Sequence, residues 1–286
     1  MHVIINTNKH VKHGGKIMDA QTQEKLLKLK RFNKIMGSLH LIQGIMMILI
    51  AIFVISSINP AFQITITQNF LNFDEVNQRL FLDTKPLFDL PFGVMVGVFL
   101  LLSALAHALI SFPKKINDMY NKDLLNGVNK LRWFEYALSS SIMIVLIATL
   151  FGIYDIATLI VIFIVNAAMN LFGLDMELLS SKRKEGEKLN WGPFIWGSIA
   201  GVAPWIAIIL YMTGSGGDVT PPWFVWAIIG TYFVAFNTFP VNMILQYKKI
   251  GKWKDYLYGE RTYIVLSLVA KSILAWLVLF GAFQPS

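Results

Sequence analysis

Seven long apolar runs are the feature that most constrains what this chain can fold into. A helix needs about 20 apolar residues to cross the hydrocarbon layer of a membrane, and each run reaches that length. Charged residues make up only 15% of the chain and apolar residues 55%, which is outside the balance of ordinary soluble domains. The sequence therefore predicts an all-α membrane protein, a seven-transmembrane-helix bundle with spans at about residues 35–56, 91–112, 132–152, 157–176, 193–213, 223–246 and 262–282.

The lysines and arginines orient the predicted bundle. Eight of them precede the first span and fourteen lie in the connections at 113–132, 177–190 and 247–261, whereas the other three connections hold only Arg79 and Lys85. Because basic residues gather in cytoplasmic loops, the N-terminus is predicted to be cytoplasmic and the C-terminus outside. The net charge of +8 then indicates a protein of the cell membrane beside anionic lipid, without a nucleic-acid partner.

The N-terminal segment is set apart from the membrane domain by its composition. Residues 1–24 are predicted to be a flexible basic tail, whose three histidines are more typical of a solvated segment than of a metal site. The membrane domain is predicted to take up residues 25–286. The chain has no cysteine, so disulfides and thiolate metal sites are excluded, and no other metal-ligand set is evident.

The first outside connection, residues 57–90, is too long for a simple turn. Ile64 and Ile66 alternate with Thr65 and Thr67, which is the period of a β-strand with one apolar face. We expect a short β-hairpin here, acting as a cap on the bundle or as a contact with a neighbouring subunit. A mobile loop is the alternative interpretation.

Ionisable side chains within apolar spans are costly, at about 2.5–3.5 kcal/mol each near a helix centre, so they usually face the bundle interior and mark function. Lys271 lies ten residues beyond Arg261, which places its amine about 15 Å into the membrane. Three further groups are predicted between the cytoplasmic face and the midplane, namely His40, His107 and Glu135. The sequence therefore predicts an interior polar cluster contributed by four different spans.

Three of these residues also have a purely structural interpretation. Glu135 stands three positions after Arg132, so the two could form an ion pair at the membrane boundary. His40 and His107 could join neighbouring helices through hydrogen bonds. Neither interpretation requires a functional site.

Lys271 is harder to explain structurally, because its own helix offers no acidic partner. It could pair with a carboxylate on another helix, carry a proton, or form a Schiff base, for which a desolvated amine is a good nucleophile. Glu135 is the only carboxylate well placed to neutralise a charge at this depth. Asp175 and Glu177 lie near a helix end and are expected to be solvated among the headgroups.

Several segments carry a family resemblance. A lysine midway along the seventh span and the R-x-x-E pattern that opens the third are typical of microbial rhodopsins. The segments RWFEYALSSSIMIVLIA, PWIAIILY and GKWKDYLYGERTYIVLSLVAKS, with the sparse interior histidines, resemble heliorhodopsins over residues 25–283. Heliorhodopsins have the N-terminus inside, which agrees with the orientation predicted from the basic residues.

The resemblance implies a site built around retinal. All-trans retinal would be bound by Lys271 as a protonated Schiff base with Glu135 as its counterion, and light would isomerise it to the 13-cis form. Ser267 and Ser139 would hydrogen-bond the Schiff base. The remaining implied residues are a polar, proton-accepting cluster of His40, His107 and Ser103, the pocket residues Met143, Met169, Pro204 and Phe236, and Glu260, to which no role is assigned.

The resemblance also implies light sensing without pumping. Where proton pumps carry a second carboxylate in the third span this chain has Leu146, which cannot donate a proton. We therefore expect a slow photocycle, a homodimer and an unidentified cytoplasmic signalling partner. No hydrolytic triad or phosphate loop is evident, so no enzyme activity is expected. Two alternatives stay open: a light-gated or light-driven proton or ion conductor, and a non-photochemical transporter with a Lys271–Glu135 charge pair.

Overall fold

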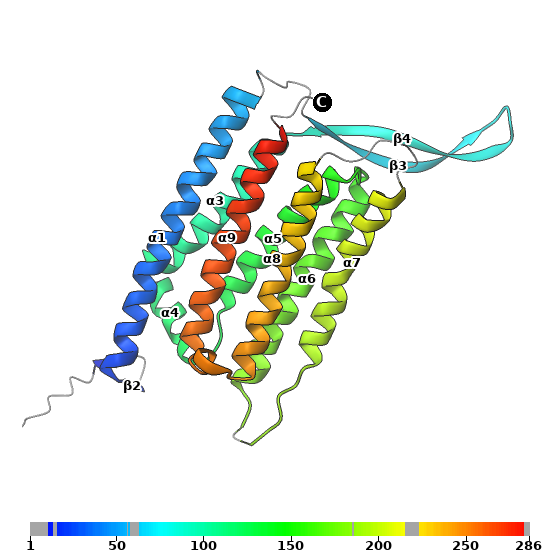
Figure 1. The fold of residues 1–286 in the computed structure, drawn as a ribbon. Coiled ribbons are helices and arrows are strands. Elements are labelled where there is room, and N and C mark those ends of the chain that lie inside the picture. The colour runs from blue at the N-terminus through cyan, green and yellow to red at the C-terminus, as the bar shows by residue number, and fades with distance from the viewer. Residues whose placement is uncertain are drawn as a thin grey trace, which may run out of the picture.

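The structure is a computed structural model that describes residues 11–13, 16–55, 57, 63–184, 186–214 and 223–282. Long helices dominate it and run side by side as one bundle (Figure 1). They are α1 (Ala20–Ile50), which continues as the π-helical segment η1 (Ala51–Ile55), α3 (Phe92–Ser111), α5 (Lys130–Leu150), α6 (Ile156–Ser181), α7 (Gly192–Gly214), α8 (Trp223–Tyr247) and α9 (Tyr256–Ala282).

The predicted spans fall on these long helices. Six of them are long and apolar enough to cross a membrane: α1 with η1, α3, α5, α6, α7, and α8 from Val225 onward. α9 is 27 residues long and packs against α1, α3 and α8, so it completes the bundle. The prediction of a mostly helical, multi-pass membrane protein is confirmed.

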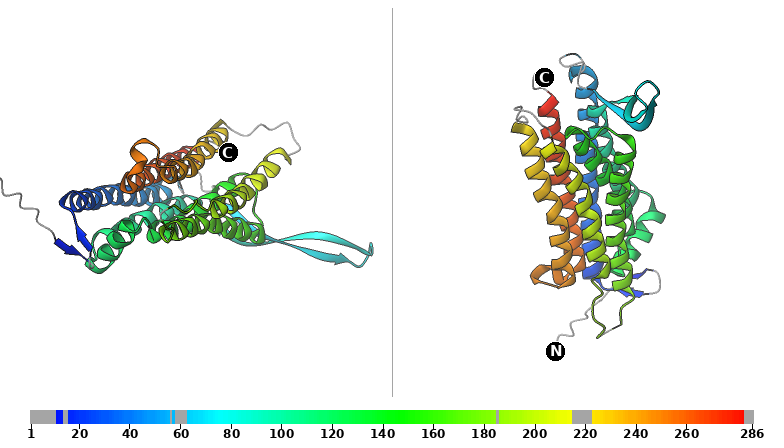
Figure 2. Two further views of the ribbon diagram at one scale, coloured as in Figure 1. Left: turned by 90° about the horizontal axis from the view of Figure 1, so that it is seen from below. Right: turned by 90° about the vertical axis from the view of Figure 1, so that its right-hand side faces the viewer.

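The helices follow one another around the bundle, with one looser contact. α3 packs on α1 and α5, α6 packs on α5 and α7, and α9 packs on α8 and α1 (Figure 2). α7 and α8 meet largely through aromatic rings, because Trp205 of α7 contacts Tyr232, Phe233 and Phe236 of α8. The backbones of these two consecutive helices are therefore less closely packed than the others.

A long β-hairpin connects the first two long helices. β3 (Ile64–Asp74) pairs antiparallel with β4 (Arg79–Leu90), and the ribbon projects well beyond the bundle (Figure 1). The predicted hairpin is confirmed, although it is longer than expected, because cross-strand pairing continues as far as Asp74 and Arg79. For the described part of this connection, the alternative of a mobile loop is wrong.

The base of the hairpin is fixed to the start of α6. Thr67 N–H donates to the Tyr154 carbonyl at 2.9 Å, and Asn69 N–H donates to Asp155 Oδ1 at 3.0 Å. Asp155 also caps α6, because its Oδ2 accepts a hydrogen bond from Thr158 N–H at 2.9 Å. Burial acts to raise the pKa of Asp155, but the hydrogen bonds from the Thr158 and Asn69 amides outweigh it and lower the pKa below its ordinary value.

The other end of the bundle carries a short helix where the sequence predicted only a connection at 113–132. This helix, α4 (Lys114–Leu125), buries Asn117, Tyr120 and Leu124 against the bundle. Spacings of three and four residues place these side chains on one face of a helix, and that pattern was the available signal. α4 therefore covers the end of the bundle opposite the hairpin, which we call the α4 end.

The N-terminal segment contains regular structure close to the bundle. β1 (Val11–His13) pairs antiparallel with β2 (Lys16–Met18). α1 begins at Ala20, so the end of the stretch 1–24 predicted as a flexible tail belongs to the first helix. Residues 1–10, which make up much of that predicted tail, lie outside the described residues.

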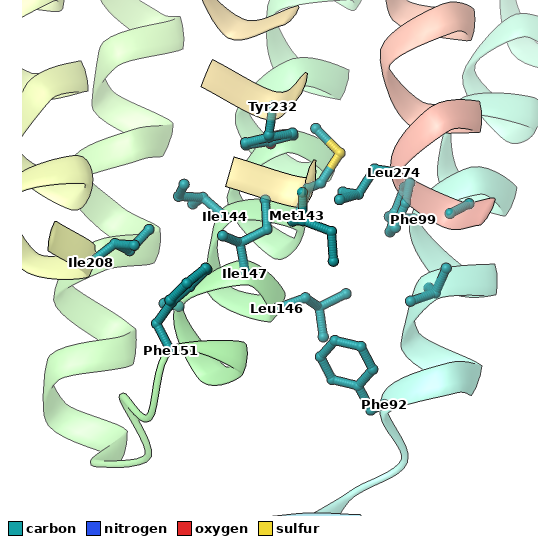
Figure 3. Packing of buried hydrophobic residues seen from close by; sticks show 14 of the residues in the cluster. Phe92, Phe99, Met143, Ile144, Leu146, Ile147, Phe151, Ile208, Tyr232 and Leu274 are labelled. Carbon is teal, nitrogen blue, oxygen red and sulfur yellow. The ribbon is translucent and has the colours of Figure 1, made fainter. Parts of the chain in front are cut away.

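An apolar core fills the half of the bundle next to the hairpin (Figure 3). Phe92 and Phe99 of α3 pack there with Leu146 and Ile147 of α5 and Leu274 of α9. Leu146, the position predicted to lack a proton donor, is therefore enclosed by hydrocarbon. Polar interior groups gather instead between this core and the α4 end.

Candidate functional site

The interior lysine and glutamate that the sequence predicts to meet lie in direct contact. Lys271 Nζ of α9 is 2.6 Å from Glu135 Oε1 of α5, and the two side chains are 4% and 11% exposed. The amine also donates to Ser103 Oγ of α3 at 2.5 Å and to Ser139 Oγ of α5 at 2.8 Å. Three helices thus converge on one ammonium group, whose three N–H bonds each have an acceptor.

Helical spacing explains this convergence. Glu135 and Ser139 are one turn apart on α5, so both project from the same face. Ser103 joins the pair to α3, because its Oγ also donates to Glu135 Oε1 at 2.6 Å. A buried ion pair costs desolvation energy, which is offset only when its remaining polar atoms are hydrogen-bonded. The two serines supply those hydrogen bonds. The single positive charge and the single negative charge offset each other locally.

Ser267, which the resemblance assigns to the same group, lies slightly apart from it. It is buried one turn before Lys271, but among the described residues no hydrogen bond joins it to the amine. Ser267 and Tyr136 line two separate cavities, described below. Ser103, which the resemblance assigns to the histidine cluster, contacts the amine instead.

The two interior histidines stack on each other. The ring centroids of His40 in α1 and His107 in α3 are 5.7 Å apart, with an interplanar angle of 17°. His107 Nδ1 lies 2.9 Å from Asn33 Oδ1, whereas neither ring nitrogen of the fully buried His40 has a partner among the described residues. The stack requires a glycine at Gly37, where a Cβ would come within 2.7 Å of His107 Cβ.

A small cavity lies beside the ion pair. Its volume is about 40 Å³, which is room for about three water molecules. Ser103, His107 and Glu135 line it together with Asn129 and Arg132. The cavity therefore joins the predicted polar cluster to a second group of charges nearer the α4 end.

That second group rules out one alternative interpretation and corrects one expectation. Arg132 does not pair with Glu135; its guanidinium bonds instead to Glu177 of α6 and Glu260 of α9. Glu177, predicted to be solvated, is 1% exposed, whereas Asp175 is exposed as expected. The reason is that α6 ends and α9 begins beside the first turn of α5, and hydropathy alone does not reveal which helix ends meet.

Neutral donors complete the second group. Asn129 N–H donates to Glu177 Oε2 at 2.8 Å, and Asn129 Nδ2 donates to Glu260 Oε2 at 2.7 Å. The Tyr256 hydroxyl donates to Glu177 Oε1 at 3.2 Å. The Arg132 guanidinium also lies over the Tyr263 ring, 4.0 Å from its centroid. Glu260 thus acquires a physical role as a partner of Arg132.

A larger cavity of about 410 Å³ also reaches Lys271. Its wall is largely apolar and aromatic, and it includes three of the predicted pocket residues, Met143, Met169 and Phe236. Pro204 is buried but does not line the cavity; its neighbour Trp205 does. Adjacent residues on a helix point about 100° apart, so Pro204 and Trp205 face different surroundings.

Comparison with known proteins identifies the family. A sequence model of the heliorhodopsin family matches residues 29–283. The chain belongs to the heliorhodopsin family. No curated protein sequence matches it. Membership makes the chain a rhodopsin-like, light-responsive membrane protein that binds retinal.

The larger cavity of this heliorhodopsin fits a retinal chromophore. Small-molecule sites are typically apolar clefts of about 300–1,000 Å³ with few polar groups, and this cavity lies within that range. Trp205, Tyr232 and Phe236 provide flat apolar surfaces for a polyene. Lys271 provides one primary amine in the wall, as a retinal aldehyde requires.

Several residues that line this heliorhodopsin pocket were not predicted from the sequence. Tyr232 stands one turn before the predicted Phe236, and this spacing was a usable signal that both face inward. Ser140 and Asn170 were harder to find, because they form a hydrogen bond of 3.0 Å between α5 and α6 as well as lining the cavity. Amide side chains inside a membrane bundle commonly join neighbouring helices in this way.

Proposed function

We propose that this heliorhodopsin is a light receptor in which Lys271 carries retinal and Glu135 is its counterion. The observation that supports this most directly is the position of the Lys271 amine. It lies in the wall of the 410 Å³ apolar cavity and is 2.6 Å from the Glu135 carboxylate. A reactive amine, an apolar pocket and a counter-charge therefore meet at one point.

Bound to lysine as a protonated Schiff base, all-trans retinal supplies visible absorption and a light-driven change to the 13-cis form. A protonated Schiff base carries a positive charge, and residues of the chain are placed to stabilise it. Glu135 stabilises a positive charge at Lys271 Nζ, and the low exposure of both groups strengthens their attraction. Ser103 and Ser139 orient the pair through their hydrogen bonds. His107, on the adjoining small cavity, is placed to accept a proton through water.

The distribution of polar groups in the bundle interior favours signalling over pumping. Polar groups gather between Lys271 and the α4 end, whereas Leu146, Phe92 and their neighbours form an apolar core toward the hairpin. A continuous polar path across the bundle is what vectorial transport would need. We infer a slow photocycle whose effects reach the α4 end. A substantial light-induced current across a patched membrane would favour the ion-conductor alternative instead.

The distribution of basic residues indicates how the receptor is oriented in the membrane. We infer that the α4 end and the N-terminus face the cytoplasm, because 22 of the 25 lysines and arginines are on that side of the predicted spans. A cytoplasmic partner would then read changes near α4. We also infer a homodimer, with the hairpin as the candidate contact between subunits.

An absorption spectrum after addition of all-trans retinal tests the proposal. The wild-type protein should develop a visible band that hydroxylamine bleaches, and Lys271→Ala should abolish the band completely. Lys130→Ala, which removes an exposed lysine at the start of α5, is the control and should leave the band intact. A wild-type protein that stays colourless would contradict the proposal and favour a transporter with a Lys271–Glu135 charge pair.

A further inference from the structure

The buried cluster at the α4 end has an uneven charge. Glu177 and Glu260 are each 1% exposed, and both bond to the Arg132 guanidinium. In the part of the chain that the structure describes, Arg132 is the only cation that forms a salt bridge with either carboxylate. Two carboxylates and one guanidinium sum to one negative charge, and an unmatched charge is costly in a site this well buried.

The remaining hydrogen-bond donors do not cancel that charge. Asn129 contributes its backbone N–H and its side-chain amide, and Tyr256 contributes a hydroxyl, all of which are neutral. The Tyr256 hydroxyl can either donate or accept a hydrogen bond. It can therefore serve Glu177 equally well as a carboxylate or as a carboxylic acid.

A second observation points to a route between this cluster and water. Arg132 is 8% exposed, and its Nε has no hydrogen-bond partner among the described residues. Arg132 and Asn129 both line the small cavity beside the Lys271–Glu135 pair, whose volume of about 40 Å³ accommodates about three water molecules. Neither carboxylate lines this cavity, but Arg132 and Asn129 each bond to both of them, so water in the cavity would lie one side chain away from the pair.

We propose that Glu177 and Glu260 form a buried proton-binding site that holds one proton between them at neutral pH. The proton comes from water and forms an O–H bond on one carboxylate oxygen. The cluster is then neutral, with one guanidinium, one carboxylate and one carboxylic acid. Carboxylates that share a buried site behave in this way, because the charge of the first opposes ionisation of the second. The site requires no retinal and does not rest on the proposed function.

The other titratable groups that face the pair do not compete for this proton. They are phenols, which are neutral near pH 7. These groups are Tyr120 of α4, Tyr136 of α5, Tyr247 of α8, and Tyr256 and Tyr263 of α9. His107 and Glu135 line the same small cavity, so they share its water with the site.

Infrared spectroscopy of the full-length protein in lipid vesicles, without added retinal, tests the site. At pH 7 the wild type should show a carboxylic-acid C=O band that shifts in D2O and disappears as the pH is raised. Glu177→Gln and Glu260→Gln should each remove the whole band, because the remaining carboxylate then forms a balanced pair with Arg132. Glu187→Gln, at an exposed glutamate between α6 and α7, is the matched control and should leave the band unchanged.

A milder variant keeps the test valid if either glutamine variant fails to fold. Tyr256→Phe alters no charge but removes one hydrogen bond to Glu177, so it should preserve the band and shift its frequency. The proposal is overturned if the wild type shows no such band at pH 7. It is equally overturned if the band persists at full strength in both glutamine variants.

Discussion

The two buried ion clusters lie one turn apart on α5 and differ in charge and in chemistry. Near the centre, Lys271 meets one carboxylate and two hydroxyls, and it borders the large apolar cavity. Nearer the α4 end, Arg132 meets two carboxylates, and neither Glu177 nor Glu260 lines that cavity. The first cluster pairs one cation with one carboxylate and borders a ligand-sized cavity, whereas in the second the carboxylates outnumber their cation and border no such cavity.

The choice of cation suits each setting. A lysine amine can lose a proton and form a covalent bond, which a guanidinium does not do under ordinary conditions. A guanidinium instead presents several donors in a fixed plane, which allows one arginine to bond two carboxylates from different helices. The lysine cluster is therefore suited to covalent chemistry, whereas the arginine cluster is suited to joining α5, α6 and α9.

Exchanging the cation of the lysine cluster should have the largest effect. Lys271→Arg keeps the positive charge beside Glu135 but removes the amine, so we expect complete loss of the retinal-dependent visible band. The protein should still fold, and thermal unfolding in detergent checks this point. A visible band that survives the exchange would mean that retinal binds elsewhere.

Removing the other cation should affect stability first. Arg132→Gln leaves two buried carboxylates without their cation, and breaking a buried pair in this way costs about 3–5 kcal/mol. Unfolding of the variant by denaturant, compared with Arg183→Gln at an exposed arginine, measures the loss. Proton uptake by the carboxylates would reduce it, so the deficit should grow as the pH is raised. A variant as stable as the control would show that this cluster does not join the helices.

Glu135, the proposed counterion, should affect the pH at which the visible band titrates. Glu135→Gln removes the nearest negative charge from Lys271 Nζ, so the positively charged form should persist only at lower pH. An opposite charge at this distance is worth about 1–3 pH units. Absorption measured across a pH series, with Glu187→Gln as the control, gives the midpoint. An unchanged midpoint would show that another group is the counterion.

The serines should produce the smallest effects and refine the geometry of the lysine cluster. Ser103→Ala removes a hydroxyl that contacts both Lys271 and Glu135, whereas Ser267→Ala removes one that bonds neither. Both variants should shift the absorption maximum modestly, and Ser103→Ala should shift it more. The reverse order would indicate that bound retinal moves the amine toward Ser267.

The parts of this protein that could be predicted from sequence are those where a membrane leaves few options. Apolar runs had to become spans, and a lysine amid such a run had to find a partner, of which Glu135 was the best placed. The hairpin also followed from local alternation at Ile64–Thr67. For the spans and the hairpin the evidence lay within one segment of the chain, and for Lys271 and Glu135 it lay in the small number of ionisable groups inside the spans.

The parts that could not be predicted depend on how distant segments meet. Glu177 and Glu260 are 45 and 128 positions from Arg132, and no local pattern shows that they converge on it. Similarly, Trp205 lines the cavity and Pro204 does not. This difference depends on how α7 is rotated about its own axis. Predicting these features requires the packing angles of whole helices.

The capping of α6 by Asp155 has a mechanical consequence. This carboxylate is bonded to the projecting ribbon at one end of α6, and Glu177 lies near the other end of the same helix. The helix has 26 residues and no internal proline, so it is a stiff rod about 39 Å long. A force applied to the ribbon on one side of the membrane would therefore displace Glu177 on the other side.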